Sequence, residues 1–113
     1  MKLVRNSPPR DFMVGQDKSI LIKDCGSIKL DPDEQITFLT GSDKEYDVVR
    51  KNWGYYATPS LNSRLKDQGF KTGLIKNSSG RYFVIIVETD KISEFMIYLK
   101  QENSYLEQWL DEL

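Results

Sequence analysis

One stretch, residues 50–65, holds most of the chemically versatile side chains of this 113-residue chain. It reads Arg-Lys-Asn-Trp-Gly-Tyr-Tyr-Ala-Thr-Pro-Ser-Leu-Asn-Ser-Arg-Leu, which places three aromatic rings among basic and amide side chains. The faces of Trp and Tyr stack on sugar rings or flat bases, and Arg and Lys hold carboxylates or phosphates. The stretch therefore predicts a ligand-binding site that is built from Lys51, Trp53, Tyr55, Tyr56, Asn62 and Arg64.

The same residues are also typical of a packed corner at the end of a strand. In that interpretation Trp53 and one tyrosine enter the core, Gly54 makes a turn, and a short helix begins at Thr58 and Pro59. Thr is a common N-cap, and Pro suits the first helical position because its missing N–H costs nothing there. The free N–H groups of such a helix start would also favour an anion. The sequence leaves both interpretations open.

The chain has no histidine and a single cysteine, Cys25, which restricts both catalysis and metal binding. Without histidine there is no Ser-His or Cys-His nucleophile pair and no ordinary general base near pH 7. One cysteine forms no internal disulfide and, without histidine, no structural zinc site. Asp24 beside Cys25 also opposes formation of the thiolate. We therefore expect no catalytic residue, no metal ligand and no cofactor.

Two further patterns have simpler explanations than a site. The acidic run at 31–34 and Asp43 lack the alternating register of a calcium loop, so turn chemistry explains them better. Residues 80–84, Gly-Arg-Tyr-Phe-Val, partly match the aromatic strand motif of RNA-recognition domains. However, strand alternation places Tyr82 and Phe83 on opposite faces, where they cannot form one stacking platform. A plain hairpin strand is the better interpretation.

The composition indicates one soluble domain without a strong charge. Charged residues make up 29% and hydrophobic residues 39%, and the formal net charge is −1. No global positive field attracts nucleic acid, which disfavours it as a partner. The first nine residues include no apolar run of signal-peptide length, and the longest apolar stretch, 83–87, is too short to cross a bilayer. We expect a cytoplasmic protein that forms a single domain over residues 1–113 and does not enter the membrane.

Alternating and continuous apolar runs predict a β-meander that is followed by helical segments. The expected strands are 19–23, 27–30, 35–40, 45–50, 70–76 and 81–88. A turn is expected at 24–26, and the apolar centre of 81–88 predicts a strand that is central and covered on both faces. Helical spacing begins at Ile92, and residues 104–113 either continue that helix or pair with the sheet.

Together these elements predict an α+β fold. We expect a mainly antiparallel sheet of about five to seven strands, a short middle helix and a C-terminal helix on one face. Residues 1–17 combine Pro8 and Pro9 with charges, which indicates a flexible arm or an edge extension. An exposed edge strand near residues 19–30 could pair two copies of the chain, so a homodimer stays open.

The core from Trp53 to Leu65 resembles a family of small bacterial proteins with no known activity. The shared pattern is W-G-x-Y-A-T-P-S-L-N-x-R-L, and Asp24–Gly26, Lys44–Val48 and Gly80–Phe83 also have counterparts in that family. The resemblance covers roughly residues 20–113. It implies a bacterial source and an accessory role in carbohydrate metabolism, and it implies no activity and no site.

We therefore predict a non-catalytic binding or accessory module that uses residues 50–65 on a protein partner or a small anionic, sugar-linked ligand. The first alternative is a small enzyme, with Glu45 or Asp47 as base and Tyr56 as acid, which requires a concave pocket. The second alternative is a protein that binds single-stranded nucleic acid. It requires one continuous groove lined by Arg50, Lys51, Arg64, Lys66 and Lys71.

Overall fold

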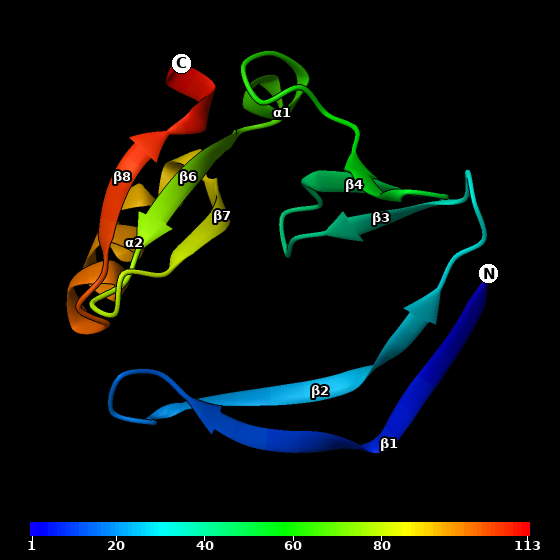
Figure 1. Cartoon of the computed structure of the whole chain (residues 1–113), viewed down its shortest axis with the longest axis horizontal. Helices are drawn as coiled ribbons and strands as arrows, with labels where there is room; N and C mark the ends of the chain where they lie inside the picture. Colours follow the sequence, from blue (N-terminus) through cyan, green and yellow to red (C-terminus); the bar gives the residue numbers. More distant parts are fainter. The chain divides into compact units, whose positions relative to one another are not determined.

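The computed structural model describes all residues from Met1 to Leu113 and contains eight strands in three small sheets (Figure 1). The elements are β1 (Lys2–Val14), β2 (Ile20–Lys29), β3 (Gln35–Leu39), β4 (Glu45–Lys51), β5 (Gly54–Ala57), α1 (Arg64–Asp67), β6 (Phe70–Lys76), β7 (Tyr82–Glu88), η1 (Thr89–Lys91), α2 (Ile92–Gln101), β8 (Tyr105–Trp109) and η2 (Leu110–Glu112). The sheet orders are β1-β2, β3-β4-β5 and β7-β6-β8. The predicted α+β class with mainly antiparallel strands is confirmed, although the strands form three sheets instead of one.

The chain divides into two compact units, and each is described by itself. The N-terminal unit comprises residues 1–37 and 47–58, and the C-terminal unit comprises residues 38–46 and 59–113.

In the N-terminal unit, β1 and β2 form a long antiparallel ribbon that includes most of the first 17 residues. The predicted turn at 24–26 is wrong, because β2 continues through it without a break. The register instead shifts between Arg5 and Arg10 of β1, which forms a bulge opposite this point. Gly26 lies there with φ +150°, and a Cβ atom on it would collide with the Val4 carbonyl oxygen. Gly26 therefore permits the close approach of two backbones and does not reverse the chain direction.

In the C-terminal unit, α2 covers one face of the β7-β6-β8 sheet. Alternation along β6 directs Gly73 and Ile75 toward this face, where a Cβ atom on Gly73 would lie 3.1 Å from Leu106 Cδ1. The buried core consists of Ile75, Val87, Phe95 and Leu99, with Ile85, Ile92, Leu106 and Trp109 packed against it. The predicted C-terminal helix on one face of a sheet is therefore present.

The strand with the most apolar sequence, β7, is not central as predicted. It pairs only with β6 and forms an edge of the sheet, and its Val84 side chain is 61% exposed. The central place belongs to β6, because β8 returns from beyond α2 to pair with the other side of β6. A short apolar run indicates burial but does not identify its neighbours.

The final residues, for which both helix and strand were open, form β8 and η2. The helix α2 ends at Gln101, and Asn103 follows with φ +51°. Such a left-handed residue ends helical propagation and redirects the chain toward β6. None of the helices has the length and apolar character that a membrane crossing requires.

The predicted middle helix is present but begins later than expected. The first two N–H groups of the helix donate to Ser60. The Ser60 hydroxyl accepts from Arg64 N–H at 2.9 Å, and the Ser60 carbonyl accepts from Leu65 N–H at 3.0 Å. Thr58 is not the N-cap, because the helix begins at Arg64 and Ser63 occupies the N-cap position. The Thr58 N–H donates instead to the Asp47 carbonyl at 3.1 Å. With only four residues, α1 is a single turn that buries Leu65 and offers no helix start for an anion.

Candidate functional site

The six residues of the predicted site are divided between the two units. Lys51, Trp53, Tyr55 and Tyr56 belong to the β4–β5 hairpin of the N-terminal unit. Asn62 and Arg64 are exposed residues of the C-terminal unit, in the loop before α1 and at its first position. The structure therefore brings four of the six together in one hairpin.

Trp53 occupies the tip of this hairpin. Lys51 pairs with Gly54, so the connection consists only of Asn52 and Trp53, and Gly54 has φ +149°. The exposed fractions of Trp53, Tyr55 and Tyr56 are 73%, 69% and 54%. All three rings therefore face solvent. Trp53 does not enter the core, as the packed-corner interpretation requires.

Tyr55 and Tyr56 lie on opposite faces of the hairpin. Tyr55 is paired with Arg50, and Tyr56 is paired with Val49. Paired residues project to the same face and neighbours along a strand project to opposite faces, so the two tyrosines cannot contact one flat ligand together. The predicted site becomes two surfaces, one on each face of the hairpin.

The Tyr55 face also contains Arg50, which the six predicted residues left out. The Arg50 guanidinium carbon lies 5.7 Å from the centroid of the Tyr55 ring, and Nη1 donates to the Gly54 carbonyl at 3.3 Å. A cation–π contact and a hydrogen bond hold the guanidinium beside the ring before any ligand arrives. The signal in the sequence was the short spacing around Gly54, which places residues 50 and 55 opposite each other in a hairpin.

The Tyr56 face has less free charge. The Lys51 ammonium forms an ion pair with the Asp33 carboxylate, which offsets the positive charge expected to attract an anion. Asp47 on the same face is buried and accepts from the Thr37 hydroxyl at 2.6 Å. These contacts fasten β4 to its surroundings and leave Tyr56 as the accessible group.

The acid–base residues of the enzyme alternative are divided between the two units, Glu45 in the C-terminal unit and Asp47 and Tyr56 in the N-terminal unit. Asp47 is 7% exposed and engaged with Thr37, whereas Glu45 is exposed at the start of β4. A cavity of about 250 Å³ on the β1–β2 ribbon is lined by Leu3, Arg5, Cys25, Gly26 and Ile28. It contains neither a carboxylate nor a tyrosine, and no group of three Cys, Asp or Glu side chains is arranged to hold a metal ion.

The basic residues of the nucleic-acid alternative are also divided between the units. Arg50 and Lys51 belong to one, and Arg64, Lys66 and Lys71 belong to the other. Lys71 contacts the Asp111 carboxylate at 2.7 Å and lies 4.8 Å from the centroid of the Trp109 ring. The hydrogen bond to Asp111 raises the pKa of Lys71. Its charge is therefore used inside the C-terminal unit.

A second exposed aromatic–cationic arrangement lies on the sheet face away from α2, and no sequence pattern indicated it. Lys76 of β6 is paired with Tyr82 on one side and Tyr105 on the other. Its ammonium lies 5.3 Å from the Tyr82 ring centroid, and the two tyrosines are 55% and 51% exposed. The helix between β7 and β8 separates the two rings in sequence, so only the strand order brings them together.

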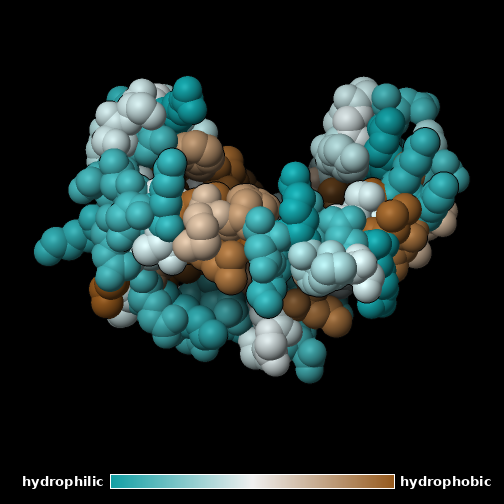
Figure 2. Space-filling model, turned by 90° about the horizontal axis from the view of Figure 1, so that it is seen from below, coloured by the Kyte–Doolittle hydropathy of each residue, from teal (hydrophilic) through white to brown (hydrophobic).

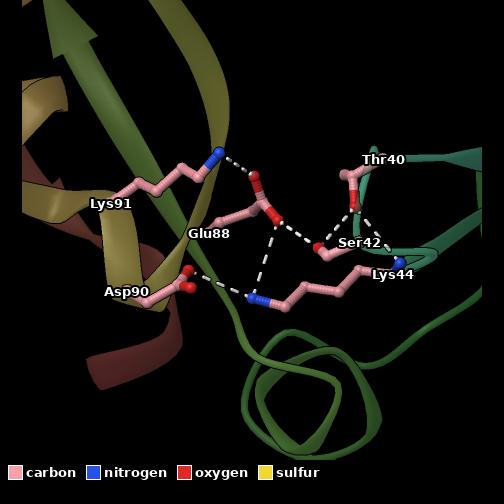
Figure 3. Close-up of polar contacts among 6 residues, drawn as sticks. All are labelled: Thr40, Ser42, Lys44, Glu88, Asp90 and Lys91. Atoms are coloured by element: carbon pink, nitrogen blue, oxygen red, sulfur yellow. Dashed lines mark hydrogen bonds and ion pairs between the residues drawn. The ribbon is translucent and has the colours of Figure 1, made fainter.

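A polar cluster in the C-terminal unit joins the tip of the β3–β4 hairpin to the end of β7 (Figure 3). The Lys44 ammonium lies 3.6 Å from a Glu88 oxygen and 3.2 Å from an Asp90 oxygen. The Ser42 hydroxyl donates to Glu88 at 3.0 Å, and this hydrogen bond lowers the pKa of Glu88. The hydrogen bond from Lys44 likewise lowers the pKa of Asp90. The aliphatic stem of Lys44 passes over Gly69, where a Cβ atom would lie 3.2 Å from Cε.

Lys44→Met is expected to lower the Tm at pH 7 and to make the protein less sensitive to acid. Methionine keeps the apolar stem over Gly69 but removes the partner of two carboxylates. The folded-state pKa of Glu88 and of Asp90 lies below its ordinary value, so both groups stabilise the fold above that value. This stability is lost as the pH falls through the folded pKa, from about pH 5 downward.

Thermal unfolding of both proteins at several values from about pH 6 to pH 3 measures this effect. Lys100→Met on the exposed surface of α2 is the matched control and should leave the pH profile unchanged. A Tm difference between Lys44→Met and the parent that is the same at all pH values would contradict the prediction.

No family model, no curated protein and no solved structure matches the chain.

Proposed function

We propose that this chain is a non-catalytic binding module of the bacterial cytoplasm that contacts its ligand through the β4–β5 hairpin. The observation that supports this function is the exposure of Trp53 and Tyr55 on one short hairpin, with the Arg50 guanidinium beside the Tyr55 ring. Large rings that contribute nothing to the core are costly on a free surface and are enriched where proteins bind partners. The burial of Asp47, whose carboxylate accepts from the Thr37 hydroxyl, supports binding over acid–base catalysis.

The Arg50–Tyr55 face suits a ligand that combines a ring with an anionic group. A pyranose ring presents C–H groups that pack on the faces of Tyr55 and Trp53. The guanidinium of Arg50 retains N–H donors besides the one directed at Gly54, and its planar fork matches a carboxylate or a phosphate. We therefore propose an acidic saccharide as the ligand class and an accessory role in carbohydrate metabolism.

A titration with an oligosaccharide of uronic acids, followed by calorimetry and by tryptophan fluorescence, tests this proposal. We expect binding of the acidic oligosaccharide and at least about tenfold weaker binding of a neutral oligosaccharide of equal length. Trp53→Phe should remove the fluorescence change while the calorimetric signal persists. Failure of the acidic probe to bind, or equal binding of both probes, would refute the proposed ligand class.

Two variants then locate the surface. Arg50→Gln and Tyr55→Ala should each weaken binding by about tenfold or more, with a Tm within about 2 °C of the parent, because neither side chain lies in the core. Tyr56→Ala is the matched control on the opposite face of the same hairpin and should retain affinity. If Arg50→Gln and Tyr55→Ala bind normally, the hairpin is not the binding surface.

A further inference from the structure

The β1–β2 ribbon has two open edges, and only one of them is suited to pairing with another strand. The edge of β1 contains Pro8 and Pro9, which lack N–H donors, next to the register shift. Proline and bulges are the features that protect an edge from other chains. In contrast, β2 extends over ten residues without proline and pairs with no strand other than β1. The outer edge of β2 is therefore available to pair with another strand.

One face of the ribbon is apolar and incompletely covered. Alternation along β2 places Ile20, Ile22 and Ile28 on the same face. Their paired residues in β1 are Val14, Phe12 and Leu3. Ile22 and Ile28 are each 39% exposed, and Figure 2 shows hydrophobic residues reaching the surface at several places among hydrophilic ones. A two-stranded ribbon is marginal on its own and gains stability when further strands extend it.

The sequence of β2 is complementary to itself about Cys25. When two copies of an antiparallel strand pair about a two-fold axis, one residue meets its own copy. Centring the pair on Cys25 places Ile22 opposite Ile28 of the second copy, which continues the apolar face across the junction. The remaining pairs are Asp24 with Gly26, Lys23 with Ser27, and Leu21 with Lys29. No like charges meet in this register.

The neighbouring registers lack this property. A centre at Lys23 or at Asp24 places that residue opposite its own copy, and a centre at Gly26 places Lys23 opposite Lys29. Like charges directly opposite each other destabilise a strand pair. Charge and apolar pattern thus select the same centre.

The backbone also has the required orientation. The Asp24 carbonyl accepts a hydrogen bond from the Asn6 side chain of β1 at 3.0 Å, so it faces inward. The trans peptide bond that joins the two residues then directs the N–H group of Cys25 toward the open edge. We propose that the chain forms a symmetric dimer in which two β2 strands pair antiparallel about Cys25, so that two ribbons become one four-stranded sheet.

The thiol of Cys25 reports on this register. Residues of a hydrogen-bonded antiparallel pair have Cα atoms about 5.5 Å apart, and Cys25 is exposed and is the chain's single cysteine. We expect light scattering to give the dimer mass for the full chain, and a short bismaleimide to link most chains in pairs. Cys25→Ser should abolish the link and keep the dimer mass.

Moving the cysteine tests the register itself. In the Cys25→Ser background, a mixture of Leu21→Cys and Lys29→Cys chains should be cross-linked between copies. Lys29→Cys alone should not be, since its two copies would lie eight residues apart along the strands, roughly 26 Å. Cys25→Pro, which removes this edge N–H, should shift the mass to the monomer while the far-ultraviolet spectrum is retained. A monomer at all concentrations up to the millimolar range, or a dimer whose Cys25 thiols are not linked, would overturn the proposal.

Discussion

Asp111→Ala is expected to lower the free energy of unfolding by about 3 kcal/mol, the largest effect of any polar substitution in the chain. The side chain of Asp111 is fully buried, and its oxygens accept from Lys71 Nζ at 2.7 Å and from Thr72 N–H at 3.2 Å. Truncation leaves a partly buried ammonium and a buried backbone N–H without this partner. Urea denaturation at pH 7 followed by circular dichroism measures the change.

Two comparisons separate the charge of Asp111 from its hydrogen bonds. Asp111→Asn retains an acceptor for Thr72 N–H and should cost less than alanine. Burial raises the pKa of Asp111, but the hydrogen bonds from Lys71 and Thr72 outweigh burial, so the net pKa lies below 3.8. Its stabilisation is therefore complete at neutral pH and is lost as the pH falls from about 5 through the folded pKa. An equal difference between parent and Asp111→Asn at pH 7 and at about pH 2 would contradict this account.

Leu99→Ala is expected to lower the free energy of unfolding by about 3 kcal/mol, because it opens a cavity in the buried cluster of the C-terminal unit. Leu99 is 2% exposed and packs with Ile75, Val87 and Phe95 beneath the sheet. The surrounding side chains belong to three different elements and cannot collapse together into the vacated space. The measurement is again the free energy of unfolding from urea titrations.

Ile97 of the same helix provides the matched control. It is 59% exposed, so Ile97→Ala should change the free energy of unfolding by less than about 1 kcal/mol. Leu99→Met, which conserves volume, should cost less than about 1.5 kcal/mol. Equal losses for Leu99→Ala and Ile97→Ala would mean that α2 does not cover the sheet as described.

The parts of the fold that could be predicted from sequence are those that depend on neighbouring residues. The hairpin of β6 and β7 is one, because Asn77 accepts from Ser79 and Arg81 N–H groups and closes the turn locally. The helix α2 is another, since its apolar spacing is itself the signal. The pairing of β8 with β6 was left open because it depends on a strand about thirty residues away, and no local pattern specifies it.

The candidate site was predictable in composition but not in arrangement. The composition of the Trp-Gly-Tyr-Tyr segment does not decide whether its rings are buried in a core or exposed at a hairpin tip. The pairing of Lys51 with Gly54 decides between them, and it places Trp53 outside. The separation of Tyr55 from Tyr56 follows from alternation once residues 54–57 are known to be a strand. Arg50 gained its place beside Tyr55 only through that pairing.

The position of β6 between β7 and β8 has a consequence for synthesis of the protein on the ribosome. The β6–β7 hairpin and α2 emerge first, and at that stage one edge of β6 has no neighbour. It acquires one only when residues 105–109 leave the exit tunnel, and Lys71 acquires its carboxylate partner two residues later. Until then the nascent chain presents an open strand edge beside an unfinished core, the kind of state that chaperones bind and that aggregates most readily.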